Sequence, residues 1–421
     1  MADKRLIPVP PRPRHREGEI LQELPEPLAL VLWQQVRHLR DWAAADEVVR
    51  GKLFCPATPD VVAKRRDAYS SAPELSPHLD VIFGVQRDPL TVDVSRVGAA
   101  CESLASWALT GEHEQTAIEL AETGALIDDT NPKLANLAGR LTRNAHAYDR
   151  SEIWFQRGIS LALERRNVVE RVWGHLGYGR LFQELGRVPG ARKHLNAGSR
   201  LAYKHGPPSL AASAQHDLCA LLIVRGHLAE AAVRARRALL WYPKNHPRLP
   251  LFAADVGLLL ILARHYRAAS WLLKRVLKVV DQGGARAAVV ALAARASAGA
   301  GDVEEAVVLR RRAEKLVSNH PVMEPAVRWH LADSRRLLGD WDSAARDAES
   351  ALTVALTRND KEAVRLIRQL TRMVEQRTVS PPKQGVSGEV RDFVQQIGHR
   401  ISIWSPRVGP WPPPWGEARA A

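Results

Sequence analysis

The chain has 421 residues, a formal net charge of +14 and a pI of about 10.1; 46% of its residues are hydrophobic but only 6% are aromatic. This length exceeds the roughly 250 to 300 residues that one hydrophobic core usually supports, so the sequence predicts several domains or one elongated repeat array. Abundant Ala, Leu, Val and Arg favour stacked helices. No run of alternating apolar and polar residues lies between Asn-Gly or Asp-Gly turns, which argues against a strand-rich fold.

Residues 1–27 are rich in proline and arginine, so we expect a flexible segment. This segment lacks the apolar stretch of a secretory signal. Residues 28–96 are expected to form an N-terminal helical cap or small bundle. Residues 28–45 carry apolar side chains at helical spacing, a second helix is predicted to start after Thr58 because Pro59 and Asp60 suit a first turn, and residues 78–85 suit a third. Such a cap would cover the open apolar face of a terminal repeat.

Residues 97–360 contain a short turn that recurs at nearly constant distance. Small residues follow each turn, as Ala231 and Ala238 follow Gly226, where one helix must approach another closely. An ordinary helical bundle would not need such regular spacing. The turns begin 35, 40, 40, 38, 37 and 38 residues apart, at Gly111, His146, Gly186, Gly226, Arg264, Gly301 and Gly339.

This pattern resembles the tetratricopeptide repeat (TPR) family, whose unit has about 34 residues. The resemblance covers about residues 97–360 as seven repeats, although the consensus Trp and Tyr are mostly replaced by smaller residues and the spacers are longer. It implies an all-α, right-handed superhelical solenoid of about seven helix pairs. Residues 361–403 are expected to form C-terminal capping helices, and residues 404–421 a Pro/Trp-rich tail that suits polyproline II structure.

In TPR proteins the first helix of each pair lines a concave groove, so the resemblance implies a partner-binding groove. The fifth repeat offers an apolar stretch there, at Leu251, Ala254, Leu258 and Ile261. Arginine binds carboxylates bidentately and tryptophan provides large contact area, so we expect an acidic or amphipathic segment of another protein as partner. Alternatively, these arginines pair with acidic residues of neighbouring repeats or simply face solvent. The predicted groove residues are Asn136, Arg140, Arg143, Trp173, Arg180, Gln183, His216, Arg295, Trp329, Asp333 and Arg336.

Catalytic and metal-binding motifs are not found in the sequence. His113 and Glu114 lack the second histidine of an HExxH zinc helix, and no phosphate-binding loop or GxSxG elbow occurs. Cys55, Cys101 and Cys219 lie far apart without a CxxC pair. We therefore predict no enzyme activity, no metal and no cofactor. The reduced cysteines and the lack of an apolar run of ~20 residues suit a bacterial-type cytoplasm.

The net positive charge is compatible with several kinds of binding partner. The electrostatic field of a positively charged protein would attract nucleic acid, acidic proteins or anionic lipid headgroups. A high arginine content also arises, however, in proteins encoded by a GC-rich genome. Helical arrays read RNA one base per repeat, which calls for more uniform repeats than these. An interaction scaffold is the preferred interpretation. A nucleic-acid-associated factor and a peptide-responsive regulatory sensor remain as alternatives, and the oligomeric state is open.

Overall fold

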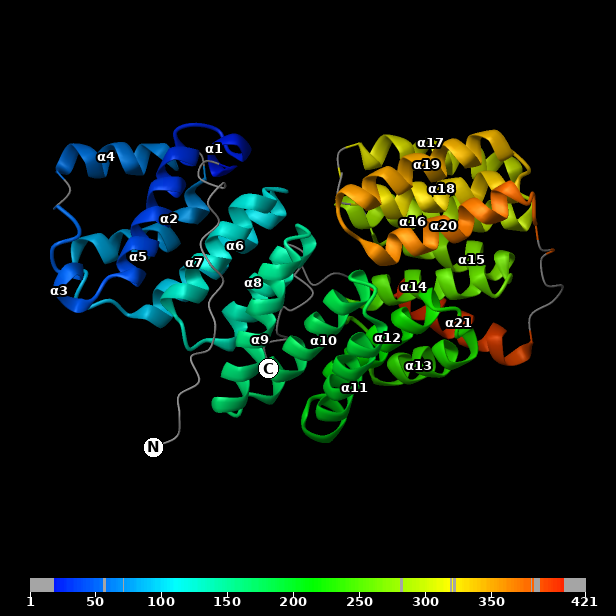
Figure 1. The fold of residues 1–421 in the computed structure, drawn as a ribbon, viewed down its shortest axis with the longest axis horizontal. Coiled ribbons are helices and arrows are strands. Elements are labelled where there is room, and N and C mark those ends of the chain that lie inside the picture. The colour runs from blue at the N-terminus through cyan, green and yellow to red at the C-terminus, as the bar shows by residue number, and fades with distance from the viewer. Residues whose placement is uncertain are drawn as a thin grey trace. The chain divides into compact units, whose positions relative to one another are not determined.

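The computed structural model describes residues 19–55, 58–70, 72–280, 283–318, 320, 323–379, 381 and 387–404. In this part of the chain the regular structure is helical, with α-helices α1 to α21, one short 3-10 helix and no strand (Figure 1). The chain divides into two compact units, residues 1–178 and 179–421. The all-α fold predicted from the sequence is confirmed. The predicted N-terminal Pro/Arg-rich segment lies outside the described residues, apart from α1 and the turn that follows it, and so does the Pro/Trp-rich tail beyond Trp404.

The first unit begins with short helices and continues into the repeats. Helix α10 (Val168–Glu184) runs from this unit into the next. The earlier helices are α1 (Glu19–Glu23), α2 (Leu28–Ala44), α3 (Glu47–Arg50), α4 (Pro59–Ala68), α5 (Ser76–Arg87), α6 (Val94–Thr110), α7 (Glu114–Ile127), α8 (Pro132–Asn144) and α9 (Tyr148–Glu164), with a 3-10 helix at Pro73–Leu75.

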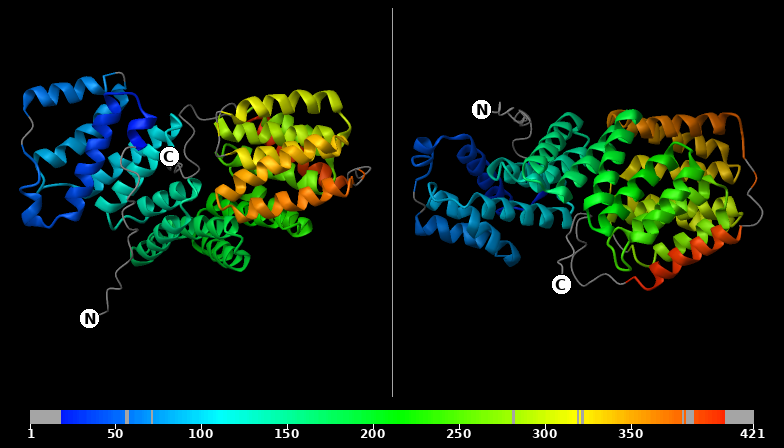
Figure 2. Two further views of the ribbon diagram at one scale, coloured as in Figure 1. Left: turned by 45° about the horizontal axis from the view of Figure 1, so that its top comes forward. Right: turned by 90° about the horizontal axis from the view of Figure 1, so that it is seen from below.

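The second unit consists of successive helices that lie side by side in pairs, as Figure 2 shows from two further directions. Its helices after α10 are α11 (Val188–His205), α12 (Pro208–Val224), α13 (Leu228–Trp241), α14 (Leu249–Leu262), α15 (Tyr266–Val276), α16 (Gly283–Ala300), α17 (Val303–Val317), α18 (Glu324–Leu337), α19 (Trp341–Thr357), α20 (Lys361–Glu375) and α21 (Gly388–Ser402).

Each of the seven predicted turns joins two consecutive helices, from α6 and α7 to α18 and α19. Every turn contains one residue with a positive φ between 58° and 83°. The next amide N–H donates to the carbonyl oxygen five residues earlier, as in His227 to Leu222, at 2.7 to 3.0 Å in the seven turns. This is the Schellman motif, which satisfies the last carbonyl groups of a helix and reverses the chain. The recurring turn therefore explains the recurring sequence signal.

The N-terminal helices are attached to the first repeat by packing and by charge. Buried leucines of α2, α5, α6 and α7 share one core, among them Leu32, Leu79 and Leu104, each fully buried. In addition, the Glu23 carboxylate accepts hydrogen bonds of 2.8 Å from the backbone N–H groups of Gln115 and Thr116. These groups lie at the amino end of α7, where a helix leaves its first N–H groups unpaired.

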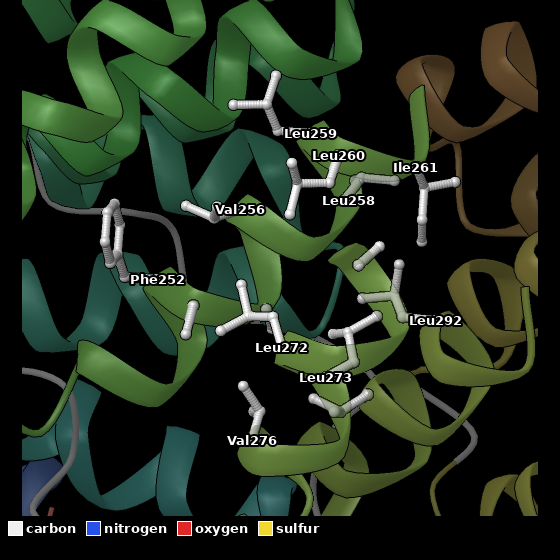
Figure 3. Close-up of a cluster of buried hydrophobic side chains, with 14 of the residues drawn as sticks. Phe252, Val256, Leu258, Leu259, Leu260, Ile261, Leu272, Leu273, Val276 and Leu292 are labelled. Atoms are coloured by element: carbon white, nitrogen blue, oxygen red, sulfur yellow. The ribbon is translucent and has the colours of Figure 1, made fainter. Parts of the chain in front are cut away.

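Helix α14 is the centre of the largest core, in the second unit. Apolar side chains surround it on nearly every side, and Figure 3 shows Phe252, Val256 and Leu260 of α14 near Leu273 and Val276 of α15. A helix that is apolar all round belongs in the interior of a protein. The apolar stretch predicted for the groove is therefore core: Ala254, Leu258 and Ile261 are buried and Leu251 is half-buried.

The two predicted C-terminal helices occupy different places. Helix α20 packs against α18 and α19 and so extends the array by one helix. Helix α21 instead packs against α14 and α15, in the middle of the unit. Arg400 of α21 donates hydrogen bonds to the carbonyl oxygens of Leu239 and Tyr242, at 2.6 and 3.0 Å. The last described residue, Trp404, donates to the carbonyl oxygen of His246.

The turn geometry predicts that Gly→Ala substitutions have opposite effects at two equally open positions. A methyl group at Gly226, whose φ is +77°, or at Gly84 inside α5 would meet no atom within 4 Å. Gly226→Ala is expected to lower the free energy of unfolding by about 1 kcal/mol, because alanine disfavours positive φ. Gly84→Ala is expected to raise it by ~0.5–1 kcal/mol, because alanine favours helix. Urea denaturation followed by circular dichroism checks both, and two changes of the same sign would contradict this account.

Candidate binding surface on the first helices of the repeats

The first helix of the second repeat, α8, holds three of the predicted groove residues in buried positions. Asn136, Arg140 and Arg143 are each 7% exposed. The side-chain amide of Asn136 donates to the backbone oxygen and to the carboxylate of Glu170, both at 2.9 Å. Burial, with Arg143 nearby, lowers the pKa of Arg140 to about 9. Asn136 thus links α8 to α10, the next first helix.

Helix α10 carries three predicted groove residues that remain partly accessible. Trp173 is half-buried in the first unit, and Arg180 and Gln183 are half-buried in the second. Arg180 and Gln183 are three residues apart, so they lie on neighbouring positions of one helical face. Arg180 also forms an ion pair with Asp217 of α12, the next first helix.

Asp217 is held between two guanidinium groups. Its side chain is fully buried and pairs with Arg180 and with Arg248, which precedes α14. Burial alone would raise the pKa of Asp217, but the two arginines lower it to about 2. Arg248 is 3% exposed, whereas the Arg180 side chain is 32% exposed. The Asp255 carboxylate of α14 also acts on Arg248, and Arg180 is the accessible cation of the cluster.

His216, next to Asp217, links α12 to two other segments. Its Nδ1 lies 3.0 Å from the Tyr242 hydroxyl and its Nε2 lies 2.8 Å from Asp255 of α14. A neutral imidazole fits both contacts, with Nε2–H donating to the carboxylate and Nδ1 accepting from the hydroxyl. Burial lowers the pKa of His216, although the hydrogen bond to Asp255 acts in the opposite direction. The predicted groove histidine is thus a buried interhelical link.

A second arginine–aspartate–arginine cluster joins α16 to α18. Asp333 pairs with Arg295 and, at 2.6 Å, with Arg336. All three are at most 6% exposed. The guanidinium of Arg295 also lies 4.9 Å from the ring centroid of Trp329, a cation–π contact. Trp329 is half-buried, so its outer surface remains accessible beside a cluster that carries one net positive charge.

The predicted groove residues therefore fall into two groups. Arg180 and Arg295 pair with aspartates of the next repeat, one of the two arrangements considered from the sequence. The half-buried group consists of Trp173, Arg180, Gln183 and Trp329, and the buried group of Asn136, Arg140, Arg143, His216, Arg295, Asp333 and Arg336.

Sequence reasoning missed the partners that hold these side chains. Asp217 and Asp255 occupy equivalent positions in the fourth and fifth repeats, nine residues before the turn residues Gly226 and Arg264. An acidic residue recurring at one register position signals an interhelical ion pair, and this signal was present in the sequence. Arg248 lies between two helices and carried no such signal.

Other sites are not indicated by the described residues. No group of three or more His, Cys, Asp or Glu side chains among them could hold a metal ion. None of the described helices is long and apolar enough to cross a membrane.

Comparisons with known proteins give weak structural similarities. No family model and no curated protein matches the sequence. The TPR2AB-domain:pHSP90 complex of yeast Sti1 matches with a TM-score of 0.26 and 14% identity, covering 66% of this chain and 98% of that chain. A Rap protein complexed with competence and sporulation factor matches with a TM-score of 0.32 and 9% identity, covering 83% of this chain and 98% of that chain.

Removing the carboxylate of Asp217 is expected to destabilise the folded protein strongly. Asp217→Asn leaves two adjacent guanidinium groups, one of them buried, without their counter-charge, so the free energy of unfolding should fall by ~3–5 kcal/mol. Asp392→Asn on the exposed face of α21 serves as the control, with an expected change within about 0.5 kcal/mol. Urea denaturation measures both, and equal effects would show that the cluster does not stabilise the fold.

Acidification below pH 6.5 is expected to destabilise the second unit. Burial lowers the pKa of His216 and His330, and it lowers that of His246 to about 4. Between pH 6.5 and 5 the unfolded chain therefore binds protons that the folded chain does not. Each such histidine contributes a loss of up to about 1.4 kcal/mol per pH unit.

Urea midpoints measured at pH 7.5, 6.0 and 5.0 check this dependence. His216→Gln combined with His330→Gln should flatten the profile relative to the wild type. A wild-type midpoint that does not change over this range would contradict the prediction.

Proposed function

We propose that the protein is a non-catalytic scaffold that binds an acidic or amphipathic segment of another protein on the first helices of its repeats. The observation that carries this proposal is the charge of the two arginine–aspartate–arginine clusters. The Asp333 cluster places two guanidinium groups around one carboxylate and retains one net positive charge. In the Asp217 cluster, where the Asp255 carboxylate also acts on Arg248, the accessible guanidinium group of Arg180 places positive charge at the surface. A carboxylate of a partner would complement that charge.

Accessible side chains beside these clusters support the proposal. Arg180 exposes part of its guanidinium-bearing side chain next to Gln183, and Trp329 exposes part of its ring next to Arg295. Arginine and tryptophan are enriched among the residues that dominate protein–protein binding energies. The buried members of the clusters fix the orientation of the exposed ones, which reduces the entropy lost on binding.

Affinity purification with quantitative mass spectrometry tests this function. Two variants remove accessible groups: the double variant Arg180→Met with Gln183→Ala, and the single variant Trp329→Ala. The first leaves Asp217 paired with Arg248, and the second leaves Asp333 paired with its two arginines. We expect at least a fivefold lower recovery of the specific protein partners. As a control, Arg311→Met changes an exposed residue of α17, the second helix of the sixth repeat, and should leave recovery unchanged.

Nuclease treatment in parallel separates protein from nucleic-acid partners. Recovery that persists after nuclease treatment and falls in the two variants supports the scaffold. Recovery that is undiminished in the variants, or that is lost on nuclease treatment, would overturn it.

A further inference from the structure

Helix α20 is a first helix without a second helix. It ends in the same turn as the others, with a φ of +48° at Arg377 and a hydrogen bond from the N–H of Thr378 to the carbonyl oxygen of Met373. The next described helix, α21, packs against α14 and α15 instead of α20. Within the part of the chain that the structure describes, one long face of α20 therefore has no helix packed against it.

This face combines positive charge with a small apolar area. Lys361, Arg368 and Arg372 lie on it at spacings of seven and four residues, and all three are exposed. Val364, between them, is half-buried, and Leu356 at the end of α19 is 52% exposed. Together with Arg365 these residues line a hollow of about 450 Å³.

The buried acidic side chain of α20 is already neutralised. Glu362 of α20 is 5% exposed and pairs with both Arg225, at 2.8 Å, and Arg365, at 2.8 Å. Arg365 also donates to the carbonyl oxygen of Val224, at 2.6 Å. Lys361, Arg368 and Arg372 form no ion pair with the residues that the structure describes. The exposed face thus carries three basic side chains and one exposed carboxylate, Glu375 at the end of α20, and so keeps a net positive charge.

We propose that this face of α20, with Leu356, is a docking surface for an acidic amphipathic helix of a partner protein. The partner helix takes the place that a second helix occupies in the other repeats. Its aliphatic side chains enter the hollow against Leu356 and Val364, and its carboxylates pair with Lys361, Arg368 and Arg372. The basic stripe covers the twelve residues from Lys361 to Arg372, whose eleven steps span about 16 Å, or three turns of a helix.

The apolar floor favours a helix over nucleic acid as the occupant. Phosphate groups would be attracted by the same cations, but their binding does not require the exposed leucine or the hollow between α19 and α20. A helix laid in a groove uses both features, since it presents apolar anchors on one face and charges beside them. Salt weakens the binding of both kinds of ligand, so the salt dependence of binding does not by itself distinguish a helix from nucleic acid.

A synthetic probe tests the docking surface directly. The probe is a fluorescently labelled 18-residue peptide, rich in Glu and Ala, with leucines on one helical face. Fluorescence anisotropy measures its Kd for the full-length protein. A scrambled peptide of the same composition, which lacks the apolar face, and a labelled single-stranded oligonucleotide serve as alternative ligands.

We expect the helical peptide to bind at least tenfold more tightly than the scrambled peptide. Arg368→Glu with Arg372→Glu should weaken its binding at least tenfold, and Leu356→Ser at least threefold. The control Arg311→Glu with Arg312→Glu reverses two exposed charges on α17 and should leave Kd unchanged. Circular dichroism of each variant verifies that it is folded.

Three results would overturn the proposal: equal binding of the helical and scrambled peptides, equal loss in the α17 control, or displacement of the peptide by the oligonucleotide at lower concentration. The variants of this surface, at Leu356, Arg368 and Arg372, leave the groove residues Arg180, Gln183 and Trp329 unchanged. Failure here therefore leaves the proposed groove function standing, and failure of the groove variants leaves this surface standing.

Discussion

Among the described residues of 179–421, a buried carboxylate is held between two guanidinium groups at Asp217, Asp333 and Glu362. Each cluster joins first helices that are distant in sequence. Taking these charges out of water is expensive, and the cost is recovered only when the carboxylate keeps its partners. The packing of the first helices against one another therefore depends on these clusters as well as on the apolar core around α14.

Two arginines for each carboxylate also determine the electrostatics of the unit. Each carboxylate is neutralised by its two arginines, so part of the arginine content behind the net charge of +14 belongs to the interhelical contacts. The buried arginines are structural. The cations available to a partner are the accessible ones: Arg180 within the Asp217 cluster, and Lys361, Arg368 and Arg372 on α20.

The helical fold could be predicted from local sequence patterns, whereas the candidate site could be predicted from them only in part. Each of the seven turns requires a residue that tolerates positive φ, and glycine fills four of them. Such a requirement is local and is visible in the sequence. In contrast, helix register placed His216 and Asp333 correctly on first helices but said nothing of their depth. Burial depends on the neighbouring helices, and it made these residues interhelical links.

The sequence by itself determined the helix pairs, their turns and the small residues at close contacts, because backbone geometry and helical periodicity act over a few residues. Only the tertiary structure decided which charges are paired and which are free. Asp217 meets Arg248 because the turn before α14 returns to α12, and Glu362 meets Arg225 because α20 reaches the end of α12. Tertiary packing also decided that α20 has no second helix among the described residues, because α21 lies elsewhere. Its apolar face packs against α14 and α15, where Val394, Ile397 and Ile401 are buried.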